Sequence, residues 1–295
     1  MSPLILVCGA TGTIGSALVQ ILVGRSVSVR AFVRDRAYAR ILQHPLVDLV
    51  EGDFRDPESI DAALRGIDRV FLLSPPALDQ VTLQGNVVEA VQRTGRRVHM
   101  TKVSVYGVTP AAPLQFARWH AITEAQIKNA GVPFTLLRPH SFMQNLVGAA
   151  PTIQEEGILY GAYGDVALPL IDARDVAAVA AEVLTGEEHT GRIYTLTGPE
   201  SLTYTQVAAR LSRELGRSVT YVDLPPERYR GTLLTGGVPG WLAEGMAELA
   251  QSFRVGPTPA VTSTVATVTG RSARPLEQFV RDYADVFLPS ARAAA

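Results

Sequence analysis

Short apolar runs alternate with longer amphipathic stretches through the first half of this 295-residue chain. The apolar runs are predicted strands and lie at residues 4–8, 27–33, 47–51, 69–73, 98–103 and 134–137. Between them, apolar positions recur at the spacing of a helix with one buried face, at residues 13–23, 37–43, 57–64, 78–93 and 114–129. Strands that alternate with helices build a parallel sheet, because each right-handed crossover lays a helix on one face. The pattern predicts an α/β protein with a doubly wound, Rossmann-type parallel sheet.

The alternation loosens beyond residue 139. Short predicted strands and helices follow there, at residues 157–160, 176–184, 192–196, 204–215 and 219–222. We expect residues 1–139 to form the Rossmann core and residues 140–295 to form mainly a smaller C-terminal α/β substrate lobe, with some segments returning to the core. Glycine and proline are concentrated at 231–240 and 255–259, which indicates a mobile flap, an interface segment or ordinary surface loops. The tail, residues 290–295, is expected to be frayed.

The first strand breaks into a glycine-rich turn, and a helix follows. The turn consists of Gly9, Ala10, Thr11, Gly12, Thr13, Ile14 and Gly15. Gly9 lets the chain turn sharply, Gly12 lets the backbone approach a pyrophosphate, and Gly15 lets the helix pack on the sheet. The helix N-terminus offers unpaired N–H groups to an anion. Because a strand and a helix flank the glycines, we interpret the turn as the dinucleotide site of an NAD(P)-binding core.

The end of the second strand indicates which nicotinamide cofactor is preferred. An NAD site usually has an acidic residue there, whereas an NADP site has a cation for the 2′-phosphate. This strand ends in Arg34, Asp35 and Arg36. We expect Arg34 to bind the phosphate and Arg36 to assist, which favours NADP(H) over NAD(H), although NAD(H) remains possible. Asp35 is expected either to cap the next helix or to accept from a ribose.

Two further segments follow strands at the edge where open α/β sheets bind ligands. Asp53 and Phe54 follow the third strand, and we expect them beside the adenine ring, with Asp53 accepting from its amino group. Ser74 and Pro75 follow the fourth strand. The alternative for each segment is a helix cap or an ordinary turn.

Composition narrows the remaining classes. The formal charge is −1 with acidic and basic residues interspersed, so no basic surface for nucleic acid or an anionic membrane is predicted. Cys8 is the single cysteine and is expected to be a buried apolar residue. The first apolar run is too short to span a bilayer, the five histidines lack metal-ligand spacing, and no G-x-S-x-G motif is present. We expect a cytoplasmic monomer or homodimer that acts on a small molecule.

At family level the sequence resembles the atypical short-chain dehydrogenases of the NmrA-like group. The resemblance covers most of the chain and rests on the segments 9–15, 33–35, 52–57, 136–139 and 172–177. Segments 142–145 and 197–203 are similar to the branch that contains NAD(P)H:quinone oxidoreductases and triphenylmethane reductases. The resemblance implies a nicotinamide-dependent reductase.

The sequence departs from ordinary short-chain dehydrogenases at the acid of the catalytic site. The family pattern places Ser104 at the serine position, but Phe116 and His120 stand where tyrosine and lysine of a Tyr-x-x-x-Lys pair are expected. A phenyl ring cannot donate a proton. Phe116, His120 and Glu124 recur every four residues and are predicted to share one helix face. His120 is a candidate proton donor or ribose contact, with a structural role as the alternative.

Other residues near this position are candidate contacts. Tyr106 is the nearby phenol that can substitute for the missing tyrosine or form a wall of the cleft. Phe116, Phe142, Asn145 and Tyr106 are candidate substrate contacts, with His140 and Gln144 as weaker ones. Glu124 is expected to orient His120 or, more simply, to be an exposed or capping carboxylate. Lys102 is expected to reach out from the strand end toward a carboxylate such as Asp172 or Asp175, because burying an unpaired ammonium is costly.

Together these features favour an NADPH-dependent reductase whose acceptor is conjugated and electron-poor, such as a quinone or a related aromatic compound. Such an acceptor needs little general acid catalysis, and the chemistry then depends on holding the reactants together. Two alternatives stay open. One is a regulatory protein that senses NADP(H) without turnover, and the other is a biosynthetic reductase or isomerase with a dedicated aromatic substrate.

Overall fold

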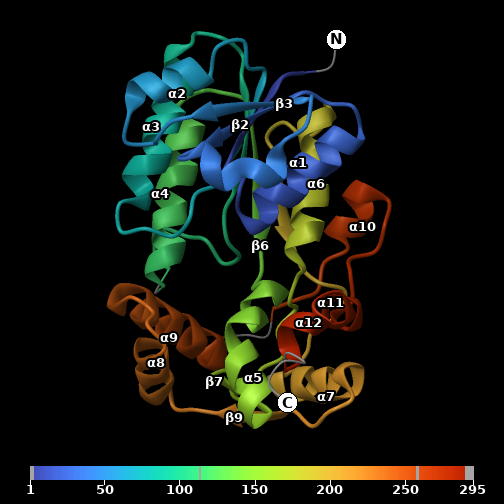
Figure 1. Cartoon of the computed structure of the whole chain (residues 1–295). Coiled ribbons are helices and arrows are strands. Elements are labelled where there is room, and N and C mark those ends of the chain that lie inside the picture. Colours follow the sequence, from blue (N-terminus) through green and yellow to red (C-terminus); the bar gives the residue numbers. More distant parts are fainter. Residues whose placement is uncertain (1–2, 113, 257–258, 290–295) are drawn as a thin grey trace.

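The computed structural model describes residues 3–112, 114–256 and 259–289, and its core is a seven-stranded parallel sheet (Figure 1). Every neighbouring pair of strands in this sheet runs parallel. The order across the sheet is β3 (Val47–Glu51), β2 (Val29–Val33), β1 (Ile5–Cys8), β4 (Arg69–Leu72), β5 (His99–Val103), β6 (Phe134–Pro139) and β8 (Ile193–Leu196). The chain reverses its direction of growth between β1 and β4, which confirms the doubly wound Rossmann-type fold.

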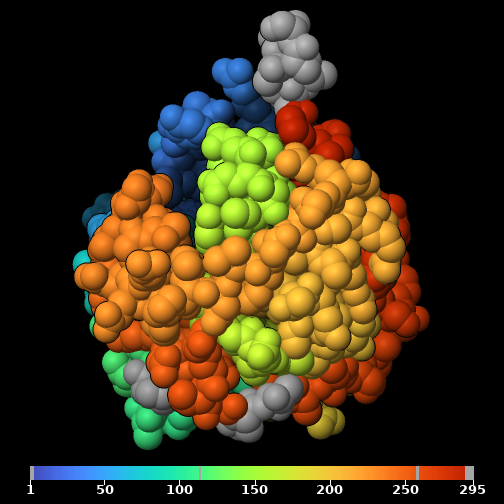
Figure 2. Space-filling model, turned by 90° about the horizontal axis from the view of Figure 1, so that it is seen from below, coloured from blue at the N-terminus to red at the C-terminus, as the bar shows by residue number. Residues whose placement is uncertain are grey.

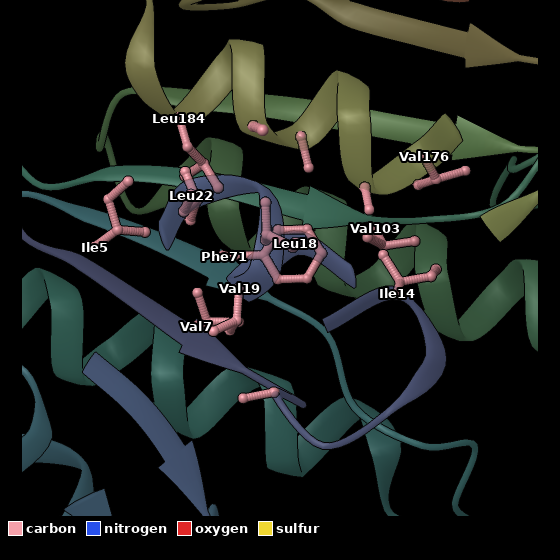
Figure 3. Close-up of a cluster of buried hydrophobic side chains, with 14 of the residues drawn as sticks. Ile5, Val7, Ile14, Leu18, Val19, Leu22, Phe71, Val103, Val176 and Leu184 are labelled. Carbon is pink, nitrogen blue, oxygen red and sulfur yellow. The ribbon is translucent and has the colours of Figure 1, made fainter. Parts of the chain in front are cut away.

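Helices cover both faces of the sheet, as the two opposite sides of Figure 1 show. One face carries α1 (Thr13–Gly24) and α6 (Ala173–Thr185), and the other carries α2 (Pro57–Ala63), α3 (Gln80–Arg93) and α4 (Gln115–Asn129). Side chains of β1 alternate between the two layers: Ile5 and Val7 join the core cluster under α1 and α6, whereas Leu6 and Cys8 join the opposite cluster. Figure 3 shows the first of these clusters. Cys8 is buried, as predicted.

Two segments from beyond residue 139 belong to this core. Helix α6 packs along α1, and β8 pairs with β6 at the edge of the sheet. Helix α6 presents a nearly continuous buried face of valine and alanine, and small side chains allow two helices to approach closely. The second layer is therefore completed by chain that is far from α1 in the sequence.

The smaller part of the molecule is built around a two-stranded parallel sheet of β7 (Ile158–Gly161) and β9 (Thr220–Asp223). Its apolar cluster is separate from the two core clusters of the large sheet. Figure 2 views this end of the molecule, where lime-green α5 lies between orange α8 and yellow-orange α7. The elements around it are η2 (Met143–Ala149), α5 (Ala150–Glu156), α7 (Tyr204–Leu215), α11 (Leu276–Asp282) and α12 (Ala284–Phe287).

The glycine- and proline-rich region 231–240 is mostly helical, which corrects the expectation of ordinary surface loops, while the flap and the interface segment stay predictions. It spans the end of α8 (Pro226–Thr235) and the start of α9 (Gly240–Val255), which form a helical hairpin. Proline is tolerated here because it lies in the first turn of α8 and at the N-cap of α9, where no intrahelical N–H bond is lost. Gly237 has a φ of 83° and closes the connection. Of the other predicted loop and the tail, residues 257–258 and 290–295 lie outside the described residues.

The remaining differences are local. The helix predicted at 37–43 is the 3₁₀ helix η1 (Arg36–Leu42), and α10 (Thr264–Thr269) lies near α6. Asp35 caps η1, because its side chain accepts from the backbone N–H of Ala37. In the described ranges, no helix is long and apolar enough to cross a membrane.

Candidate active site

A groove of about 450 Å³ runs along the carboxyl ends of the core strands. Its walls come from the β1–α1 turn, the ends of β2, β3 and β4, and the start of η2 after β6. This is the edge at which open parallel sheets bind ligands, at the point where the strand order reverses. Elements far apart in sequence thus form one elongated site.

The glycines of the β1–α1 turn are required by the geometry. Gly9 has a φ of 67°, and a Cβ there would lie 2.9 Å from the carbonyl oxygen of Leu73. A Cβ at Gly15 would overlap the carbonyl group of Gly9, so this glycine lets the helix pack against the turn itself. Gly12 is the N-cap of α1, and among the described residues no side chain caps this helix. The N–H groups of the first turn of α1 are therefore left for an anion in the groove, where a capping side chain would otherwise bind them.

The turn residues divide into lining and support. Gly9, Thr11, Gly12, Thr13 and Ile14 line the groove, whereas Ala10 is fully buried in the core beneath it. This division fits a dinucleotide: the backbone and small side chains meet the ligand, while Ala10 anchors the turn.

One end of the groove combines a cation with aromatic rings. Arg34 lines it directly after β2, and Arg36 does not belong to the lining, since it begins the exposed helix η1. Phe32 and Phe54 stack with centroids 5.7 Å apart and planes 11° apart. A side chain at Gly52 would overlap the Phe32 ring, so this glycine allows the stack to form. This end can hold a flat base beside a phosphate.

Asp53 lies at the same end, within the turn after β3. Its carboxylate accepts from the backbone N–H of Arg55, and Ser59 bonds its backbone. Asp53 therefore both stabilises the turn after β3 and lines the groove.

The opposite end of the groove is formed by Ser74, Pro75, Phe142, Gln144 and Asn145. Gln84 Nε2 donates to Ser74 Oγ at 2.8 Å. The Gln144 amide is held at both ends, because it donates to Asp172 and accepts from the backbone N–H of Ala173. Phe142 and Asn145 face the groove without such fixed partners among the residues described, and so they are available to a second ligand.

Behind this end, Lys102 is completely buried, which corrects the expectation that it reaches outward. Its Nζ donates to His120 Nδ1 at 2.7 Å and to the carbonyl oxygen of Val103 at 3.0 Å. Asp172 and Asp175 instead pair with Arg174 and Arg274, respectively. In the described part of the chain, no carboxylate lies within ion-pair distance of Lys102.

Burial determines the protonation of this pair. It lowers the pKa of Lys102 to about 7, and the charge of Glu124 opposes this shift only partly. Burial and the neighbouring Lys102 lower the pKa of His120 well below its usual value. Because Nδ1 accepts from Lys102, the neutral imidazole carries its proton on Nε2. The Gln80 amide nitrogen, 3.5 Å away, is itself a donor and does not accept this proton.

Glu124 is also buried, so the exposed or capping role expected for it is wrong. It accepts from Ser104 Oγ at 2.7 Å and from Arg138 Nη2 at 2.6 Å. Burial opposes its negative charge, but these hydrogen bonds outweigh that effect and its pKa lies below the usual value. The Ser104 hydroxyl donates its hydrogen bond to Glu124, and neither Ser104 nor His120 belongs to the lining of the groove. These residues form a polar layer beneath it.

Phe116 and Tyr106 lie outside the groove lining. Phe116 packs against Trp119 and Trp241, with centroids 5.6 and 6.3 Å away, and against the backbone of Gly245. The face of α4 predicted to enter the cleft therefore splits: Phe116 contacts α9, whereas His120 and Glu124 face β5. The Tyr106 ring lies 5.0 Å from the ring of His140.

Sequence reasoning missed several of these contacts. The Phe32 stack could have been found from the glycine that follows β3, since a glycine often marks a close approach. The sequence held a weaker signal for the Lys102–His120 hydrogen bond, because a lysine within an apolar strand needs a partner in the interior. In the described residues, no group of three or more histidine, cysteine, aspartate or glutamate side chains could hold a metal.

Comparison with family models places all of these site residues within one family. Residues 1–277 match the model of the NmrA-like family. The chain belongs to the NmrA-like family. This confirms the family suggested by the motifs. The expectation of a nicotinamide cofactor rests on the Rossmann core and its glycine turn.

Three similar proteins carry names that describe reductases. An NAD(P)H azoreductase of Xenophilus azovorans is 38% identical over 284 residues, which are 96% of this chain and 99% of that protein. An NADPH-dependent quinone oxidoreductase of Escherichia coli, solved with NADPH, has a TM-score of 0.86 and 28% identity, with 94% of this chain and 99% of that chain covered. The Citrobacter triphenylmethane reductase solved with NADP(H) has a TM-score of 0.85 and 26% identity, with the same coverage. The branch of the family suggested by segments 142–145 and 197–203 is thereby confirmed.

Proposed function

We propose that this protein is an NADPH-dependent oxidoreductase that transfers hydride to a conjugated acceptor such as a quinone or a related aromatic compound. The observation that carries the proposal is that one groove is lined by the anion-binding turn, by Arg34 and by the pair Phe142 and Asn145. The names of the similar proteins support the same class, because they describe reduction of azo compounds, quinones and triphenylmethane dyes.

The chain's own residues supply the cofactor site. The turn from Gly9 to Gly15 would hold the pyrophosphate, chiefly through Thr11, Gly12, Thr13 and Ile14, which line the groove. Arg34 binds the 2′-phosphate through charge-assisted hydrogen bonds. Phe54 and Asp53 would hold the adenine, and Ser74 and Pro75 would form the wall at the nicotinamide end. NADPH, when bound, supplies the hydride.

Reduction of a quinone needs one hydride and one proton to balance. Phe142 and Asn145 orient the acceptor against the nicotinamide end of the groove, so that proximity does most of the catalytic work. His120 lies beneath the groove lining, so the proton that its Nε2 atom supplies in this proposal reaches the acceptor through water. As Nε2 loses its proton, the Lys102 ammonium group transfers one to Nδ1, so the imidazole stays neutral and Lys102 becomes a neutral amine. Phe116 and Tyr106 lie outside the groove lining, so the acceptor contacts in this proposal are those of Phe142 and Asn145.

The function is tested by following NADPH oxidation by absorbance with purified protein. The acceptors are a simple naphthoquinone, an azo dye and a triphenylmethane dye, and NADH serves as the comparison cofactor. We expect turnover with NADPH to exceed that with NADH. Tight binding of NADPH without turnover on any acceptor would contradict the reductase proposal.

The role of His120 needs its own variant. His120→Ala is expected to lower turnover and to change its pH profile, whereas Trp119→Phe, on the same helix, is expected to leave the pH profile unchanged. An unchanged rate and pH profile in His120→Ala would remove this residue from the reaction.

A further inference from the structure

His140 is a buried imidazole whose ring has no hydrogen-bond partner in the part of the chain that the structure describes. It directly follows β6, it is 3% exposed, and its backbone N–H donates to the carbonyl oxygen of Leu196. Both ring nitrogens are buried, and neither has a partner among the described residues. A neutral imidazole carries one donor and one acceptor, and leaving such groups unsatisfied in the interior is costly. This residue therefore costs stability that an apolar ring of similar size would not.

Two aromatic rings enclose the imidazole. Phe253 of α9 stacks on it, with centroids 5.1 Å apart and planes 29° apart, and Tyr106 lies 5.0 Å away on a tilted plane. Burial lowers the pKa of His140 to about 4, so the ring is neutral at physiological pH. Nothing in this surrounding uses the polarity of the ring. A phenyl group would fill the same aromatic slot.

The slot lies at the same edge of the sheet as the acceptor end of the groove, and neither His140 nor Tyr106 belongs to the groove lining. His140 stands at the carboxyl end of β6, and the same chain segment continues into Phe142 and Asn145, which line the groove. Tyr106 is anchored at the same edge, because its backbone N–H donates to the carbonyl oxygen of Pro139. The Tyr106 side chain is 37% exposed, so turning it outward uncovers one side of the imidazole.

We propose that His140 is a specificity-determining residue that hydrogen-bonds a carbonyl oxygen of a planar acceptor. This inference rests on the proposed function and names the class of acceptor that the site favours. A quinone oxygen accepts the imidazole N–H, which then gains the partner that it lacks in the free protein. A triphenylmethane dye with dialkylated amino groups has no equivalent oxygen and gains nothing from this residue. His140 therefore makes the protein selective for carbonyl-bearing acceptors.

The test replaces the polar ring with an apolar one in His140→Phe. Acceptor binding is measured with saturating NADP⁺, so that no reduction occurs, by the quenching of the fluorescence of the two tryptophans, Trp119 and Trp241. We expect the Kd for a simple naphthoquinone to rise about tenfold, which is the loss of one hydrogen bond, and the Kd for the triphenylmethane dye to change less than about twofold. We also expect the melting temperature to rise by about 3 °C, because two unpaired polar atoms leave the interior.

A second buried histidine provides the matched control. His189 Nδ1 is hydrogen-bonded to the hydroxyl of Tyr194 at 2.9 Å. Tyr194 belongs to β8, the edge strand of the sheet, and neither residue lines the groove. His189→Phe removes a satisfied hydrogen bond, so it is expected to lower the melting temperature and to leave both Kd values unchanged. The two substitutions thus shift stability in opposite directions.

The outcomes separate this inference from the proposed function. Equal Kd values for the naphthoquinone in wild type and His140→Phe would overturn the assignment, as would a wild-type protein that does not bind the quinone. A lowered melting temperature in His140→Phe would mark a purely structural histidine. Quinone binding that depends on His140, without NADPH oxidation by any acceptor, would overturn the reductase proposal and leave the binding role of His140 in place.

Discussion

Replacing Lys102 with methionine measures what it costs to keep an ammonium group inside strand β5. The chain has only two lysines, Lys102 and Lys128, which makes a clean comparison possible. Lys102 is completely buried, and in the described residues its hydrogen-bond partners are the neutral imidazole of His120 and a backbone carbonyl. Methionine has a similar length and no charge. Two effects oppose each other at pH 7, since the variant loses these hydrogen bonds but also the buried charge.

The dependence on pH isolates the charge. The pKa of Lys102 is lowered from 10.5 to about 7 in the folded protein. Above pH 7 the folded state releases this proton while the unfolded state keeps it up to about pH 10.5, so the unfolded state binds more protons and stability rises with pH. The contribution is complete above the unfolded pKa and is lost as the pH falls to 7. Between pH 7 and pH 9, wild type should gain about 2 kcal/mol relative to Lys102→Met.

The assay is urea unfolding followed by tryptophan fluorescence at pH 7 and at pH 9. The side chain of Lys128 is 43% exposed and lies 3.7 Å from Glu124, so Lys128→Met is the matched control. Its ammonium group meets water in both states, and we expect the same small difference from wild type at both pH values. If the free-energy difference between wild type and Lys102→Met does not change with pH, the ammonium group is as well solvated in the folded protein as in the unfolded chain, and the reasoning is refuted.

Three further predictions test the groove and its support. Arg34→Ala should weaken NADPH binding by about tenfold to a hundredfold and leave NADH binding nearly unchanged, and Arg36→Ala should have a smaller effect. Equal losses for both cofactors in a binding titration would exclude Arg34 from the 2′-phosphate site. Gly15→Ala should weaken both cofactors more than about tenfold, because its Cβ displaces the carbonyl of Gly9, and wild-type affinity would contradict the role of this turn. Glu124→Leu should lower the free energy of unfolding by about 3 kcal/mol in urea titrations, since it leaves Arg138 and Ser104 without their acceptor, and an unchanged midpoint would show that Glu124 does not hold this layer together.

The core fold was predictable because its signals are local. The alternation of apolar runs and helical periodicity needs only neighbouring residues, and the eleven helices and strands predicted in the first half begin and end within two residues of the predicted positions. The turn from Gly9 to Gly15 is equally local, since a φ of 67° and a close helix approach each select glycine at a fixed position. The same holds for α7, where Thr203 and Gln206 form a reciprocal cap.

The α8–α9 hairpin shows where local signals mislead. Its glycines and prolines resemble a loop in composition, but they lie at the helix ends and in the connection, where they are compatible with helix. The apolar face of α9 is stabilised by contacts that the pattern cannot specify, among them the aromatic group of Phe116, Trp119 and Trp241. Tertiary packing therefore decided the secondary structure of this segment.

The sequence by itself determined the sheet, the phosphate-binding turn and the edge at which the site had to form, because hydrophobic periodicity and backbone conformation depend on residues close together in the chain. Only the tertiary structure decided the partners of the buried polar groups. Lys102 donates to His120, Glu124 accepts from Ser104 and Arg138, and the His140 ring has no hydrogen-bond partner among the described residues. The physical reason is that the cost of burying a charge or a hydrogen-bonding group depends on which distant side chain reaches it, and spacing along the chain does not specify that.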